Sequence, residues 1–130
     1  MVGALVLVLT GGQGCGIFVD PTCTGLNPPG IEIDVMDAGS GWFVPQSANP
    51  IGFLVSGRLQ VRETMTEVDP DPDRTVLVGA HDRPGIYDVE IVAEGYEPWH
   101  ATGISVQMDH CGHAGTVKMT ARLLPSPPTG

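Results

Sequence analysis

Apolar and polar residues alternate one by one through most of the chain from Ile31 onward. Successive side chains of a β-strand point to opposite faces, so each alternating run gives a strand one core face and one solvent face. No window shows the 3.6-residue period of an amphipathic helix. The apolar sets that share one parity are Ile31, Ile33 and Val35; Phe53, Val55, Gly57, Leu59 and Val61; Tyr87, Val89, Ile91 and Ala93; Ile104, Val106 and Met108; and Val117, Met119, Ala121 and Leu123. The pattern predicts an all-β protein.

Turn-forming segments separate these runs. The chain contains 18 glycines and 12 prolines, and turn residues gather at 37–41, 83–85, 94–95 and 112–115. Such residues favour tight turns and positive φ angles. A further short apolar run lies at 75–78. Short strands punctuated in this way predict two antiparallel sheets packed face to face, an immunoglobulin-like sandwich of about seven strands.

Length and charge limit the possible partners. The 130 residues fit one domain. Fifteen acidic residues against six basic ones give a formal net charge of −9. A surface with this balance repels phosphate backbones and anionic headgroups, so the sequence disfavours nucleic-acid partners and electrostatic membrane binding.

The chain opens with an apolar run over residues 2–9 that a glycine-rich stretch then interrupts. About eight apolar residues cannot cross a bilayer, which needs roughly 20 as a helix, but they match the apolar region of a secretory signal. With Cys15 after it, the segment resembles a bacterial lipoprotein signal. The resemblance implies an exported cell-envelope protein whose anchor is a lipid on Cys15. Simple cleavage of the signal and an N-terminal strand of the fold are the alternatives.

The three cysteines raise the question of which one is unpaired. If Cys15 carries lipid, Cys23 and Cys111 remain as one disulfide pair. The alternative is a metal site built on the cluster of His110, Cys111 and His113, with His81 or His100 as a further ligand. No second Cys-x-x-Cys or spaced His pair completes a zinc pattern. We therefore expect a disulfide and no bound cofactor, with the metal site as the alternative.

The stretch "RPGIYDVEIVAEGYEPW" at 83–99 resembles the Pro-Gly-x-Tyr…Gly-Tyr-x-Pro hairpin of carboxypeptidase regulatory-like domains, which are transthyretin-like β-sandwiches. "GIEIDVMDAGSG" at 30–41 is similar to their first strand and turn, and "GTVKMTARL" at 115–123 to their last strand. The resemblance implies a sandwich over 30–124 that is not itself an enzyme. Segments 1–14, 15–29 and 125–130 are then the signal-like segment, the linker with its anchor cysteine, and a flexible tail.

Motifs for catalysis or calcium binding are weak. No His-Glu-x-x-His, Gly-x-Ser-x-Gly or phosphate-binding glycine loop occurs. Asp69, Asp71 and Asp73 form an acidic segment, but Arg74 stands where a calcium loop of the EF-hand type needs glycine. His81 and the adjacent Asp82 would point to opposite faces of an extended chain. We expect no catalytic residues.

Four aromatic residues are candidate partner contacts: Trp42, Phe43, Tyr96 and Trp99. If the segment from Trp42 to Val44 is exposed, it forms a recognition patch, and if it folds inward, it closes one end of the core. The sequence thus predicts a non-enzymatic binding or scaffolding module of the envelope, with an unknown envelope protein or saccharide as partner. An envelope metal-binding protein and an accessory domain of a separate enzyme are the alternatives.

Overall fold

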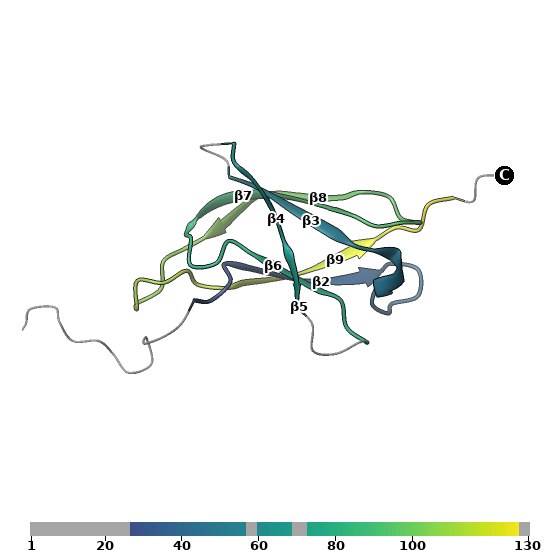
Figure 1. The fold of residues 1–130 in the computed structure, drawn as a ribbon, viewed down its shortest axis with the longest axis horizontal. Helices are drawn as coiled ribbons and strands as arrows, with labels where there is room; N and C mark the ends of the chain where they lie inside the picture. Colours follow the sequence, from purple (N-terminus) through teal and green to yellow (C-terminus); the bar gives the residue numbers. More distant parts are fainter. Residues whose placement is uncertain (1–26, 57–59, 69–72, 128–130) are drawn as a thin grey trace, which may run out of the picture.

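The computed structural model describes residues 27–56, 60–68 and 73–127. In this part of the chain the fold is all-β, and two mostly antiparallel four-stranded sheets lie one over the other (Figure 1). The predicted all-β class is therefore confirmed. The first sheet has the strand order β5-β6-β2-β9, with β5 at Thr66–Val68, β6 at Val76–Gly79, β2 at Ile31–Asp37 and β9 at Val117–Leu123. The second has the order β4-β3-β7-β8, with β4 at Arg62–Thr64, β3 at Ile51–Ser56, β7 at Gly85–Val92 and β8 at Trp99–Val106.

One strand pairing differs from the prediction of purely antiparallel sheets. β2 pairs with β9 in parallel, in a register that runs from Ile31 opposite Val117 to Asp37 opposite Leu123. The other strand pairs of the two sheets are antiparallel. Both β2 and β9 therefore begin at the same end of the molecule and run toward the opposite end (Figure 1).

The inward side chains of four predicted strands are confirmed. Buried apolar residues alternate along β2, β7, β8 and the second half of β9, and they fill the space between the sheets. These residues are Ile31, Ile33, Val35, Tyr87, Val89, Ile91, Ile104, Val106, Ala121 and Leu123. Met108, which shares the parity of the inward side of β8, lies past the end of that strand and is 64% exposed.

The strand predicted through 53–61 on the parity of Phe53 is wrong in two respects. β3 ends at Ser56, where the chain turns and the Ser56 amide bonds to the Val61 carbonyl at 3.0 Å. The inward side chain is Leu54, which is fully buried, whereas Phe53 is half-buried under the Arg62 guanidinium, 4.1 Å from its ring centroid. Both faces of β3 carry apolar residues, so alternation alone did not determine which face packs inward.

The chain crosses from one sheet to the other at Met65. β4 pairs with β3 in the second sheet, and β5, one residue further on, pairs with β6 in the first. Met65 lies between them, is 5% exposed, and its amide bonds to the Gly52 carbonyl at 2.8 Å. The segment therefore ties the two sheets along one side.

A short 3₁₀ turn at Gln46–Ala48 closes the segment that follows β2. Thr75, which is buried just before β6, donates from Oγ1 to the Val44 carbonyl at 2.6 Å and holds this segment against the core. Within the residues that the structure describes, no helix is long and apolar enough to span a membrane.

Candidate functional site

The loops of the sandwich gather at its two ends (Figure 1). The end where the described chain begins, here the amino end, comprises residues 28–30, 80–84 and 107–116. The opposite end, here the carboxyl end, comprises residues 38–50, 93–98 and 124–127. The predicted partner residues and Cys111 lie at different ends.

Trp42 projects from the carboxyl end and is 75% exposed. The turn that carries it is held by Asp37, whose carboxylate accepts hydrogen bonds from the amides of Gly39 at 2.7 Å and Ser40 at 3.0 Å. The Asp37 amide in turn bonds to the Trp42 carbonyl at 2.6 Å. The exposed indole thus stands on a backbone fixed by several hydrogen bonds.

Tyr96 reinforces this turn from the β7–β8 connection. Its hydroxyl donates to Asp37 Oδ2 at 2.6 Å. This hydrogen bond, together with partial burial and the negative charge of Asp37, raises the pKa of Tyr96 to about 12. The same bond, with the two backbone amides, lowers the pKa of Asp37. The pair joins two connections that are 59 residues apart in sequence.

The other predicted contact residues are less accessible. Phe43 is half-buried, with the Arg74 guanidinium 5.7 Å from its ring centroid, and Trp99 is half-buried against the core. Val44 is fully buried. The segment after β2 therefore divides, with Trp42 outside and Val44 closing the core. Leu124, a residue that the sequence did not suggest, is 61% exposed at the same end.

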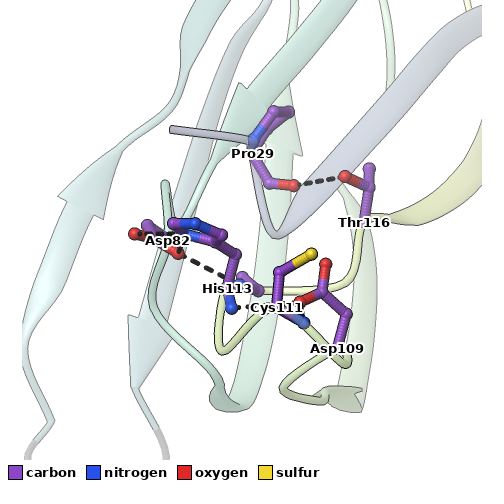
Figure 2. A network of polar contacts seen from close by, with 7 residues as sticks. Pro29, Asp82, Asp109, Cys111, His113 and Thr116 are labelled. Atoms are coloured by element: carbon purple, nitrogen blue, oxygen red, sulfur yellow. Dashed lines mark hydrogen bonds and ion pairs between the residues drawn. The ribbon is translucent and has the colours of Figure 1, made fainter. Parts of the chain in front are cut away.

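At the amino end, Asp109 shapes the loop that carries Cys111 (Figure 2). Its carboxylate accepts hydrogen bonds from the amides of Cys111 at 2.8 Å and His113 at 3.0 Å. Gly112 between them has a φ of 80°, a left-handed conformation that glycine adopts without strain. The position of Cys111 is thus defined by its loop.

Asp82 joins this loop to the start of the described chain. Its carboxylate accepts hydrogen bonds from His113 Nδ1 at 3.0 Å and from the Ala114 amide at 3.1 Å (Figure 2). Its own amide bonds to the Pro28 carbonyl at 2.8 Å. The hydrogen bond from His113, followed by that from Ala114, lowers the pKa of Asp82. Three segments of the amino end therefore meet at Asp82, two of them through its carboxylate and one through its backbone amide.

The residues of the alternative metal site have different neighbours. His113 faces Asp82, and His100 lies on β8 with its Nε2 3.1 Å from Glu90 Oε2. His110 Nε2 is 3.4 Å from Cys111 Sγ. Among the residues that the structure describes, no group of three or more His, Cys, Asp or Glu side chains is arranged to hold a metal ion. His81, which is half-buried, precedes the network at Asp82.

Several predicted sites lie outside the described residues. These are the signal-like segment, Cys15, Cys23, Asp69 and Asp71. Asp73, the last member of the acidic segment, is described and exposed.

The amino end carries a second cluster, around Tyr87, which includes an ion pair that the sequence did not predict. The Tyr87 hydroxyl donates to the Arg83 carbonyl at 2.7 Å, and the Arg83 guanidinium forms an ion pair with Glu63. Burial raises the pKa of Tyr87. A pocket of about 410 Å³ opens beside these residues. Glu63 lies on β4, a strand that the alternation did not predict, so no sequence signal placed it opposite Arg83.

Comparison with known proteins leaves the site to be interpreted from its geometry. No protein-family model matches the chain, and no curated protein matches its sequence.

Proposed function

We propose that this chain is the binding module of an exported, lipid-anchored cell-envelope protein, and that it presents Trp42 to a partner at the end away from the membrane. In this proposal the module is a transthyretin-like sandwich of the carboxypeptidase regulatory-like type, and it is not an enzyme. Cys15 carries the lipid, and Cys23 pairs with Cys111.

The exposure of Trp42 carries the proposal. A tryptophan side chain exposed to water makes fewer favourable apolar contacts than a buried one. Tryptophan is also over-represented among the residues that dominate binding energy at protein interfaces. Trp42 is 75% exposed although its backbone is fixed by the Asp37 turn. An exposed aromatic side chain on a fixed backbone loses less conformational entropy on binding than one on a mobile loop, which favours affinity.

The direction of the strands supports the proposed orientation. Pro28 follows Cys15 by 13 residues, so the chain between them reaches at most about 45 Å. It joins the domain at the amino end, and β2 and β9 both lead away from that end (Figure 1). A seven-residue strand covers roughly 20 Å. An anchor on Cys15 would therefore attach the domain by its amino end and leave Trp42 at the end farther from the point of attachment.

The β7–β8 hairpin supports the proposed fold family. Its residues make the contacts that their types suggest, with the Tyr87 ring in the core and its hydroxyl on a loop carbonyl. Gly95 has a φ of 83° at the turn, and the amide of Tyr96 bonds to the Ala93 carbonyl at 3.2 Å.

The location of Cys111 supports the proposed disulfide. Its loop lies beside the start of the described chain, where Thr116 Oγ1 donates to the Pro29 carbonyl at 2.7 Å (Figure 2). Pro28 follows Cys23 by five residues, a stretch that spans at most about 18 Å. Cys23 is thus tethered within reach of this loop.

Replacing Cys15 by Ser tests the anchor. We expect the variant to move from the membrane fraction to the soluble fraction and to lack the mass of a lipid. Cys23→Ser, a matched change in the same linker, is expected to stay in the membrane fraction with the lipid retained. Unchanged partitioning of Cys15→Ser would refute lipid anchoring.

Site-specific photo-crosslinking in intact producing cells tests the partner surface. A photoreactive amino acid in place of Trp42 is expected to give one discrete adduct. The same group at Thr120, an exposed position on β9, is expected not to give it. Absence of an adduct at position 42, or an identical adduct from position 120, would contradict the proposal. Mass spectrometry of the adduct would show whether the partner is an enzyme.

A further inference from the structure

The pocket at the amino end combines an apolar floor with a polar rim. Leu54 is fully buried and Tyr87 is 6% exposed, and Val61 and Pro84 complete the apolar lining. Ser56, Glu63, Asp82 and Arg83 supply the polar groups. A volume of about 410 Å³ lies within the range of small-molecule sites, which are mostly apolar with a few polar groups that orient the ligand.

The two carboxylates of the rim already have donors. Glu63 pairs with Arg83 and is 3.4 Å from the Ala80 amide, and Asp82 accepts from His113 and Ala114. The Arg83 guanidinium carries five N–H groups in a planar fork. One of its nitrogens donates a hydrogen bond to Glu63. Its side chain is 52% exposed. The main hydrogen-bonding group that remains at the rim of the pocket is therefore the positively charged guanidinium of Arg83.

We propose that this pocket binds a small amphipathic monocarboxylate, such as a medium-chain fatty acid, with its carboxylate on Arg83 and its hydrocarbon part over Leu54 and Tyr87. The planar fork of arginine matches a carboxylate in shape as well as charge. This site lies at the end opposite Trp42 and is independent of the function proposed above.

Glu63 gives the proposal a specific consequence. Its carboxylate occupies one edge of the same guanidinium that the ligand would use, so it competes with the ligand for Arg83. Loss of the positive charge must weaken binding, and loss of the competing negative charge must strengthen it. A pocket that retained ligands only through apolar contact would not respond in opposite directions to these two changes.

Titration of the purified protein with octanoate, followed by amide NMR shifts, tests the site. We expect saturable shifts around the pocket, with a dissociation constant on the order of 1 mM or lower. Arg83→Gln is expected to weaken binding roughly tenfold or more, because a hydrogen bond to a charged group is lost. Glu63→Gln is expected to tighten it. Arg62→Gln is the matched control, since Arg62 is similarly exposed, at 59%, but lies over Phe53, and it should leave binding unchanged.

Two related probes and one further variant complete the test. Octanol and octylamine should bind more weakly than octanoate, and Val61→Asp, which places a negative charge on the pocket wall, should weaken octanoate binding even if Arg83→Gln fails to fold. Equal binding of octanol, preferential binding of octylamine, or weaker binding in Glu63→Gln would overturn the proposal. So would the absence of saturable shifts with octanoate.

Discussion

At the scale of single residues, aspartate side chains organise the loops at both ends. Asp37, Asp82 and Asp109 each accept at least one backbone amide hydrogen bond, and each fixes a turn or joins two segments. The role of Asp37 could be read from its turn sequence, since Asp commonly accepts amides two or three residues ahead. The role of Asp82 could not, because its partners His113 and Ala114 are 31 and 32 residues away.

Asp82→Asn is expected to lower stability at neutral pH and to lose this effect in acid. The pKa of Asp82 is lower in the folded protein than in the unfolded chain, where it is about 3.9. The ionised carboxylate therefore stabilises the fold at pH values above the unfolded pKa, and this contribution is lost as the pH falls through the folded pKa. Asn tolerates the φ of 53° at this position, so the change removes chiefly the charge.

Urea unfolding of both proteins at a series of pH values from about 6 down to about 2 measures this difference. The gap in unfolding free energy should narrow as the pH falls. Asp37, whose pKa is also lowered, gives both proteins a common acid dependence. A gap that stays constant over the whole range would show that the Asp82 charge does not stabilise the fold.

Tyr96→Phe is expected to remove part of the alkaline loss of stability. The pKa of a tyrosine in the unfolded chain is about 10, whereas the pKa of Tyr96 in the folded protein is about 12. Its contribution is therefore fully present below about pH 10 and is lost as the pH rises toward 12. Unfolding midpoints at a series of alkaline pH values should show a steeper decline for the natural protein than for the variant. Equal slopes would contradict the assignment, and the raised pKa of Tyr87 accounts for any slope common to both.

At the scale of elements, alternation predicted a strand well where only one of its faces is apolar. In β2 the apolar Ile31, Ile33 and Val35 alternate with side chains of which two are acidic, and the inward face followed from the sequence. In β3, Phe53 and Val55 face outward and Leu54 inward, so the pattern allowed either assignment. The crossing at Met65 and the parallel pairing of β2 with β9 depend on how distant segments meet, which no local pattern records.

A pair of alanine substitutions in β3 measures which face packs inward. Leu54→Ala is expected to lower the unfolding free energy by about 2–5 kcal/mol, as for other fully buried leucines. Phe53→Ala should cost less, about 1–2 kcal/mol, because Phe53 is half-exposed and loses mainly its contact with Arg62. Urea unfolding gives both values. A larger loss for Phe53→Ala, although it removes the larger side chain, would show that the faces are reversed.

At the scale of the whole molecule, the two ends of the sandwich carry different chemistry. The carboxyl end has the exposed Trp42 on its fixed turn, and the amino end has the Cys111 loop, the Asp82 network and the pocket near Arg83. The sequence named Trp42 and Cys111 as candidates, but it could not show that they lie at opposite ends. That separation follows from the sheet topology, in which β2 leads from one end to the other (Figure 1).

The proposed bridge between Cys23 and Cys111 makes stability at this scale dependent on oxidation. It would close a loop of about 88 residues, for which loss of chain entropy in the unfolded state gives an upper value of about 4–5 kcal/mol. With Cys15 replaced by Ser to remove the third thiol, reduction is expected to lower the urea midpoint, and Cys111→Ser is expected to lower it by the same amount. Reduction of the Cys111→Ser protein should then have no further effect. Cys111 lies in a loop outside the sheets, so the loss should come without a change in the fold, which an unchanged pattern of amide NMR shifts in the strands would show. A midpoint that reduction leaves unaltered would mean that the sheets alone stabilise the domain.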